Sequence, residues 1–218
     1  MSAARTAAAP AAQPLLPTLA AMAFLLAVAL AAASRATAGF RAWTAEDVRR
    51  LQVAEQPAPL SDLRVVASDG RERSLWSGDP QARAWLVTFI YTRCPSVCQS
   101  LGTEFQQLQS ALRSPAAAPG VRLASIAFDR ANDTPDALSA YARRYGADPA
   151  TWLVAVPASG AALERLLAEA GVTVIADGAG GFAHNAAIHV VVPPGRLVRI
   201  FAMDRHREAL EFAGSIAR

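Results

Sequence analysis

The sequence predicts an α/β domain with a mixed central sheet flanked by helices, preceded by an N-terminal hydrophobic helix. Apolar strand-like runs alternate with amphipathic helix-like segments through most of the chain, which is the pattern of a sheet covered by helices. Two hairpin signals flank this alternation, so the sheet is expected to be mixed. The 218 residues suffice for one domain of roughly 150–180 residues and an extension.

The extension is the first 38 residues. No charged residue lies between Thr6 and Ser34, and residues 15–33 are almost continuously apolar. A helix of about nineteen residues spans roughly 28 Å, close to the hydrocarbon thickness of a bilayer. Residues 1–38 are therefore expected to be a membrane anchor or a signal peptide, since Ala36-Thr37-Ala38 resembles a cleavage site. In either case the following domain is expected outside the cytoplasm, where disulfides form.

Residues 39–59 are expected to form a short helix and a linker. Thr44 is a capping residue followed by acids, which predicts a helix over 44–53, and 55–59 reads as the linker. The domain is then expected to span residues 60–218. It begins with a hairpin in which residues 63–66 and 74–76 flank the turn sequence Ser68-Asp69-Gly70.

The remaining elements follow in order, each with its own signals. Residues 85–91 are a continuous apolar run, expected to be a central strand buried on both faces. Apolar residues three and four apart predict a helix over 96–112. Thr134-Pro135-Asp136 supplies a cap, a first-turn proline and a favourable charge for the next helix. The other expected elements are strands over 121–128, 152–156, 188–192 and 197–201, and helices that stop at Gly146 and Gly171 and span 206–217.

The charge pattern excludes one class of partner. The formal net charge is +3. No cluster of arginines is interleaved with aromatic residues in the manner of a nucleic-acid surface, so no nucleic-acid partner is expected.

The two cysteines, Cys94 and Cys98, lie in one five-residue window after the apolar run. Pro95 suits the first position of a helix, which puts Cys94 at the cap and Cys98 one turn later. Residues four apart on a helix have Cβ atoms about 5–6 Å apart, a spacing that suits either a disulfide or two thiolates on one metal ion. The helix start and Arg93 are expected to lower the thiol pKa values. A static disulfide is the alternative, although so short a loop stabilises weakly.

The three histidines are candidates for completing a metal site. His184 lies in the glycine-rich segment 180–185, which would let a loop fold over the cysteine-bearing helix start. His189 lies five residues further on, inside a strand, where it would face the opposite side. His206 begins the last helix and is expected to be exposed.

The sequence around these residues resembles the Sco/SenC family of copper-binding, thioredoxin-like assembly factors of cytochrome c oxidase. The resemblance runs from about Leu60 to Phe201. The matching segments are the strand and cysteine pair, the acidic loop after the next strand, the end of the helix that follows, and the histidine before the last hairpin: residues 89–98, 125–135, 141–147 and His184. Two departures are Gln99, where the family commonly has proline, and Pro194 before Gly195, where the family commonly has aspartate.

The resemblance implies a thioredoxin-like fold and a copper site formed by Cys94, Cys98 and His184. It implies a metallochaperone that delivers one copper ion, as Cu(I) or Cu(II), to the copper-accepting subunit of a terminal oxidase. A thiol reductant protein would then be a second partner and the membrane a third, with the domain on the periplasmic side of the inner membrane. No catalytic residues are expected, apart from the cysteine pair as a redox-active disulfide.

Three alternatives remain open at this stage. Two cysteines and one histidine also describe an open zinc site. An enzyme that reduces the cysteines of a copper-site target, a thiol–disulfide oxidoreductase, would use the same cysteine pair. A peroxidase-like or redox-sensing relative of thioredoxin is the third.

Overall fold

A computed structural model of the chain describes residues 15–94, 97–114, 117 and 119–218. The chain divides into two units, Met1–Val48 and Arg49–Arg218. Helix α2 (Ala45–Glu55) runs across the boundary between them.

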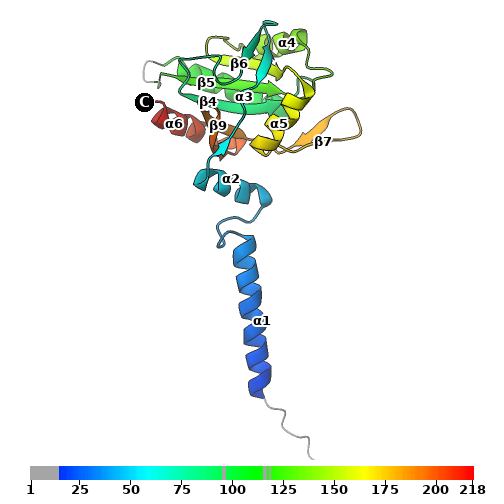
Figure 1. The fold of residues 1–218 in the computed structure, drawn as a ribbon, viewed down its shortest axis with the longest axis vertical. Coiled ribbons are helices and arrows are strands. Elements are labelled where there is room, and N and C mark those ends of the chain that lie inside the picture. The colour runs from blue at the N-terminus through cyan, green and yellow to red at the C-terminus, as the bar shows by residue number, and fades with distance from the viewer. Residues whose placement is uncertain (1–14, 95–96, 115–116, 118) are drawn as a thin grey trace, which may run out of the picture. The chain divides into compact units, whose positions relative to one another are not determined.

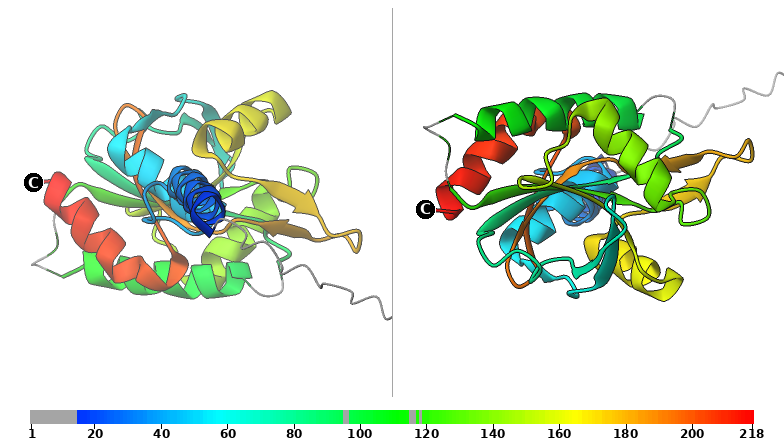
Figure 2. Two further views of the ribbon diagram at one scale, coloured as in Figure 1. Left: turned by 90° about the horizontal axis from the view of Figure 1, so that it is seen from below. Right: turned by 90° about the horizontal axis from the view of Figure 1, so that it is seen from above.

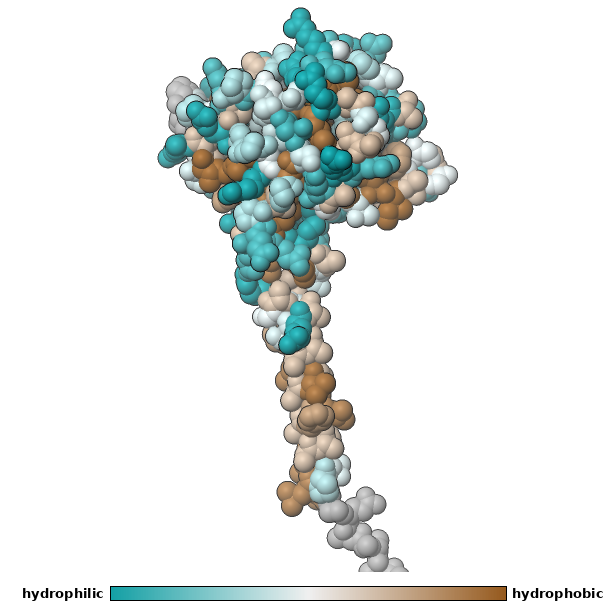
Figure 3. All heavy atoms as spheres, viewed as in Figure 1, coloured by the Kyte–Doolittle hydropathy of each residue, from teal (hydrophilic) through white to brown (hydrophobic). Residues whose placement is uncertain are grey.

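The first unit contains one long helix, α1 (Leu15–Ala36), which has no buried residue. Its 22 residues correspond to about 33 Å, enough to cross a membrane by length and composition. Figure 3 shows apolar side chains over the visible face of this helix. The helix agrees with the apolar segment expected from the sequence, and both an anchor and a signal peptide have these properties.

The second unit is built on a mixed sheet of eight strands in the order β1-β10-β9-β4-β5-β6-β2-β3 (Figure 1). Strands β4, β5 and β6 are parallel, and the other neighbours pair antiparallel. The strands are β1 (Ala58–Pro59), β2 (Arg64–Ala67), β3 (Glu72–Ser74), β4 (Ala84–Ile90), β5 (Val121–Ala127), β6 (Trp152–Pro157), β9 (Ile188–Val192) and β10 (Arg196–Phe201).

Helices cover both faces of this sheet. The right-hand view of Figure 2 shows α3 (Val97–Leu112), α4 (Pro135–Tyr145) and α6 (His206–Ile216) on one face and α5 (Gly160–Ala170) on the other. A short 3-10 helix, η1 (Met203–Arg205), leads into α6. The predicted α/β architecture with a mixed central sheet is confirmed.

The local helix signals work as the sequence predicts. Thr134 caps α4, its hydroxyl accepting from the Ala137 N–H, and proline occupies the first turn. Gly146 and Gly171 end α4 and α5 in the left-handed conformation, with φ of 61° and 64°.

Three features differ from the expected elements. Ala58 and Pro59, in the segment expected as a linker, pair with β10. The third strand ends at Ser74, so Trp76 lies beyond it. The glycine-rich segment 180–185 is not an irregular loop throughout, because Phe182–His184 form strand β8, which pairs with β7 (Val174–Ala176) in a second, two-stranded sheet. Figure 2 shows this hairpin extending beyond the helices.

Strand β4 explains how the cysteine segment is positioned. All seven of its residues are buried, as expected for a strand covered on both faces. Its parallel register with β5 pairs Ile90 with Ala127, and the Phe128 N–H donates to the Ile90 carbonyl at 2.9 Å. The segments that follow β4 and β5 therefore leave the sheet side by side at one edge.

Candidate metal centre

Cys94 lies at the edge of the sheet where β4 ends. Its backbone N–H donates to the Tyr91 carbonyl at 3.2 Å, which closes a turn after the strand, and 8% of the residue is exposed. The backbone of Cys98 lies in the first turn of α3. Pro95, which was expected at the first helical position, and Ser96 lie outside the described residues. The structure thus places Cys94 in the turn that follows β4 and the backbone of Cys98 within the first turn of α3.

Asp133 holds the segment that leads to Cys94. One carboxylate oxygen accepts from both the N–H and the hydroxyl of Thr92, at 2.8 and 2.7 Å, and the other accepts from the Asp129 N–H at 2.9 Å. Asp133 is buried, with 1% of its surface exposed. Burial raises the pKa of Asp133, and the hydrogen bonds from Thr92 oppose that shift. The helix cap is Thr134, so Asp133 connects the two loops at this edge of the sheet.

Arg93 makes a second connection between the same two loops. Its guanidinium pairs with the buried Asp129 carboxylate at 2.9 Å, and the Asn132 side-chain amide donates to both oxygens of that carboxylate. The charge of Arg93 is therefore balanced by Asp129.

His184 is the last residue of β8, and its ring contacts Phe128 edge-on with centroids 5.1 Å apart. Both ring nitrogens are buried and have no hydrogen-bond partner among the residues that the structure describes. Burial lowers the pKa of His184, which favours the neutral imidazole that binds metal ions. A buried imidazole without partners is costly in an apolar setting, so its nitrogens suit a ligand.

Aromatic and polar contacts hold the His184 hairpin beside the cysteine segment. The Tyr91 hydroxyl bridges the Phe182 backbone, donating to its carbonyl at 3.4 Å and accepting from its N–H at 3.3 Å. The rings of Tyr91 and Phe182 lie 5.3 Å apart, and both contact Phe128. Arg93 donates to the Gly180 carbonyl at 3.4 Å. These contacts place His184 and Cys94 at the same edge of the sheet.

The other two histidines lie elsewhere. His189 is a buried residue of β9, as expected, where its ring contacts Phe89 edge-on and its Nε2 lies 3.5 Å from an Arg49 nitrogen. His206 begins α6, but it is half-buried, with both ring nitrogens inaccessible. The expectation that His206 is exposed was wrong, because α6 packs against α3.

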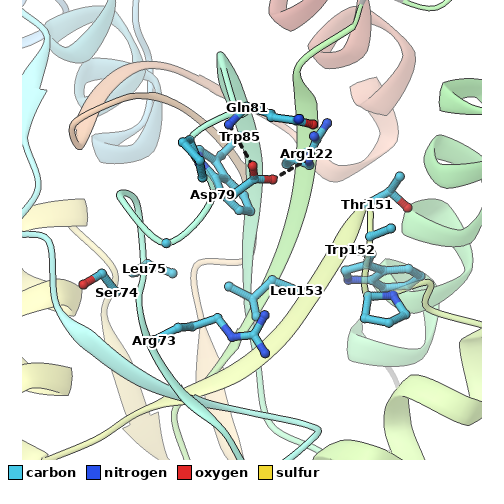
Figure 4. Close-up of a pocket in the computed structure, with 14 residues that line it drawn as sticks. Arg73, Ser74, Leu75, Asp79, Gln81, Trp85, Arg122, Thr151, Trp152 and Leu153 are labelled. Carbon is cyan, nitrogen blue, oxygen red and sulfur yellow. Dashed lines mark hydrogen bonds and ion pairs between the residues drawn. The ribbon is translucent and has the colours of Figure 1, made fainter.

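A separate cavity of about 330 Å³ opens at the opposite end of the parallel strands. Figure 4 shows Trp85, Arg122 and Trp152, which lie at the starts of β4, β5 and β6, among its lining residues. The Arg122 guanidinium is paired with Asp79 at 2.6 Å. The cavity lies at the start of β4, whereas Cys94 follows the end of that strand, so the cavity is distinct from the candidate centre.

The donor set suits a soft metal ion. No group of three histidine, cysteine or acidic side chains with metal-binding spacing occurs among the described residues. The side chain of Cys98, the third member of the expected set, lies outside the described part of the structure. Thiolates favour Cu(I) or Zn²⁺, and an imidazole supports Cu(II) in the same set.

Sequence reasoning missed the contacts that position the candidate ligands. Thr92 and Asp133 are 41 positions apart, and Tyr91 and Phe182 are 91 apart, so no local pattern joins them. The resemblance of residues 125–135 to the acidic loop of the family is the one sequence signal that points to Asp129 and Asp133.

The chain is similar in sequence and fold to known proteins. The family model described as SCO1/SenC matches residues 60–213. A curated relative, the SCO1 protein homolog of Bacillus subtilis (strain 168), is 26% identical over 133 residues, which cover 60% of this chain and 67% of the relative.

Solved structures of Sco proteins share the fold. The structure of Bradyrhizobium japonicum ScoI with copper bound has a TM-score of 0.60 and 21% identity, covering 73% of this chain and 99% of that one. BsSco, described as a member of the Sco family of cytochrome c oxidase assembly proteins with a disulfide switch, has a TM-score of 0.64 and 20% identity, covering 74% and 95%. The fold of the second unit is thioredoxin-like. With a family model that matches most of its length, the chain belongs to the SCO1/SenC family.

Proposed function

We propose that this protein is a copper metallochaperone that binds one copper ion through Cys94, Cys98 and His184 and delivers it to a terminal oxidase during cytochrome c oxidase assembly. The observation that carries the proposal is the position of His184, whose ring contacts Phe128 and whose two buried nitrogens have no hydrogen-bond partner among the described residues. The nitrogens of His206 share that burial, but His206 lies in α6, away from the hairpin. The hairpin that bears it is bonded to the segment that bears Cys94.

Relatives support the choice of copper and of the oxidase. The Bradyrhizobium protein was solved with copper bound, and BsSco is described as a cytochrome c oxidase assembly protein. The cysteine pair and His184 occupy positions in this chain that match the ligands expected for the family. Copper is the cargo here, held by two soft thiolates and by an imidazole that burial keeps neutral.

Copper loading requires the reduced cysteine pair, because the thiolate is the ligand. Reduction of a Cys94–Cys98 disulfide consumes two electrons and two protons. A dithiol reductant protein supplies them and becomes a disulfide itself. A reductant partner on the same side of the membrane is therefore part of the proposal. Helix α1 would hold the domain in the cell envelope, on the periplasmic side of the inner membrane.

The test is metal binding by the full chain, purified in detergent with both cysteines reduced. Cu(I), Cu(II) and Zn²⁺ are titrated separately into the wild-type chain, His184→Ala and His206→Ala, the last as a histidine outside the proposed set. We expect nearly one copper ion per chain, bound more weakly by His184→Ala and unchanged in His206→Ala. Absence of copper binding with reduced cysteines would overturn the proposal, and a preference for zinc would assign the site to that metal.

The second candidate is a thiol–disulfide oxidoreductase that reduces the cysteines of a copper-site target. It is favoured by the position of Cys94, which follows a buried strand and precedes a helix start where peptide N–H groups stabilise a thiolate. Reduction of a model protein disulfide separates the two functions. Reductase activity that survives His184→Ala and is lost in Cys94→Ser, without copper binding, would favour the enzyme.

A further inference from the structure

Two large aromatic side chains are exposed just after α1. Trp43 is 74% exposed and Phe40 is 45% exposed, and their rings contact each other with centroids 6.1 Å apart. Tryptophan is highly buried on average in soluble domains, and the other three in this chain are 1–4% exposed. Trp43 therefore differs from every other tryptophan of the protein.

The backbone between α1 and this aromatic pair forms a hydrogen-bonded turn around Thr37. Thr37 donates through both its N–H and its hydroxyl to the Ala33 carbonyl, and the Gly39 N–H donates to the Ser34 carbonyl. The Thr37 carbonyl in turn accepts from the N–H groups of Arg41 and Ala42, and its hydroxyl accepts from Phe40. Two of the last four carbonyls of α1, those of Ala33 and Ser34, are thus bonded within the chain, which suits a helix end at the edge of an apolar phase.

Phe40 adopts a backbone conformation that is uncommon for a residue with a side chain. Its φ is 64°, in the left-handed region, and φ of Ala38 is 48°. Such conformations cost on the order of 1–3 kcal/mol each and persist where the surroundings enforce them. Here the turn brings the Phe40 ring onto Trp43, on the surface of the first unit.

We propose that Phe40 and Trp43 form an interfacial anchor that inserts into the headgroup region of the membrane crossed by α1. Amphipathic aromatic rings concentrate at the level of the headgroups, where one edge is apolar and the other is wet. Arg35, in the last turn of α1, is exposed and provides donors for lipid phosphates. The partner is a phospholipid surface, and the contact begins where the spanning helix ends.

This inference deepens the proposal that α1 holds the copper domain at the membrane. An aromatic pair bound at the headgroups favours a retained α1, because the turn then continues a helix that is still in the bilayer. Cleavage after Ala38 would leave Phe40 and Trp43 next to a new, charged N-terminus, which is a poor substitute for the spanning helix.

The test uses the full chain reconstituted into vesicles of zwitterionic and anionic phospholipid. The emission of Trp43 is obtained as the difference between the wild-type chain and Trp43→Phe. We expect a blue-shifted emission that lipids brominated in the upper acyl chain quench strongly, lipids brominated near the terminal methyl quench weakly, and aqueous acrylamide barely quenches. Phe40→Ser is expected to shift the emission to the red and to increase quenching by acrylamide.

Emission typical of water-exposed indole, quenched by acrylamide and by neither brominated lipid, would overturn the anchor. Strong quenching only by the deep lipid label would also overturn it, because it places Trp43 inside the hydrocarbon. Copper binding measured on the same vesicles reports separately on the proposed function, since Phe40 and Trp43 belong to neither the cysteine pair nor the histidine hairpin. The two proposals therefore fail independently.

Discussion

The Asp133 carboxylate accepts hydrogen bonds from both the backbone N–H and the hydroxyl of Thr92, two residues before Cys94. It also accepts from the N–H of Asp129, whose side chain pairs with Arg93. One buried acid thus fixes the conformation of two loops at the edge of the sheet. The proposed metal centre depends on this arrangement for the position of its first thiol.

Asp133→Asn is predicted to destabilise the protein. The amide group has one acceptor oxygen and one donor NH₂, so it cannot accept from Thr92 and from the Asp129 N–H at the same time. A buried donor left without an acceptor costs about 1–3 kcal/mol, and we expect the free energy of unfolding to fall by that amount. Chemical denaturation measures it. Asp136→Asn is the control, since the exposed Asp136 contributes only its charge at the start of α4, about 0.3–1 kcal/mol. Equal losses in both variants would contradict the role of Asp133.

Tyr91→Phe is predicted to loosen the His184 hairpin and to leave the core intact. The variant keeps the ring contacts with Phe128 and Phe182 but removes the hydroxyl that bridges the Phe182 backbone. We expect faster hydrogen exchange at the Phe182 amide and weaker copper binding, with unfolding free energy lowered by about 0.5–1.5 kcal/mol. Tyr145→Phe removes a hydroxyl that bonds to none of the described residues and is the control. Unchanged exchange at Phe182 in Tyr91→Phe would show that the bridge does not hold the hairpin.

Gly102→Ala is predicted to destabilise the contact between α3 and α4. In a helix interior, alanine is more favourable than glycine by about 1 kcal/mol. A Cβ at Gly102, however, would lie 2.5 Å from the Tyr145 ring. Overpacking of this kind costs about 1–3 kcal/mol, so we expect a net loss of stability. Gly160→Ala in the first turn of α5 meets no atom within 4 Å and serves as the control. A melting temperature for Gly102→Ala at or above that of the wild-type chain would refute the steric argument.

Glu104 is predicted to make stability fall as the pH rises. Burial raises the pKa of Glu104, the charge of Asp204 adds to the shift, and one carboxylate oxygen is buried without a hydrogen-bond partner. The unfolded chain loses this proton near pH 4.5, before the folded chain does, so the stabilising contribution is present below that pH. It is lost as the pH rises through the higher folded-state pKa.

Glu104→Gln has no such proton to lose. Its melting temperature is expected to decline less than that of the wild-type chain between about pH 4 and pH 7, measured in one buffer series. The exposed Glu164→Gln is the control and should follow the wild-type curve. Parallel curves for the wild-type chain and Glu104→Gln would exclude the effect.

Much of the fold was predictable because its signals are local. Thr134, Gly146 and Gly171 each act on the turn in which they stand, and the apolar run of β4 identifies the central strand by itself. The two-stranded sheet that ends at His184 escaped prediction, because its strands have three residues each and a glycine-rich connection. Strand β1 escaped for the same reason, since it has only two residues.

The sequence predicted the candidate ligand residues, but it did not predict the contacts that hold them in position. The spacing of Cys94 and Cys98 identified the cysteine pair, and resemblance to a family identified His184. The hydroxyl of Tyr91 and the carboxylate of Asp133 act on partners tens of positions away. Such partners meet only when the parallel pairing of β4 and β5 and the return of the chain through β8 bring them to one edge.

The separation of β7 and β8 from the main sheet bears on how tightly cargo is retained. In the proposed centre, Cys94 and Cys98 follow strand β4 of the main sheet, whereas His184 lies on the separate β7–β8 hairpin. That hairpin contacts the cysteine segment through the Tyr91 hydroxyl, the Arg93 guanidinium and several aromatic rings. Local opening of such a hairpin requires far less free energy than unfolding of the core. The dissociation rate of the metal would therefore be set by the hairpin, and a docking partner that displaces the hairpin could accelerate transfer while the fold stays intact.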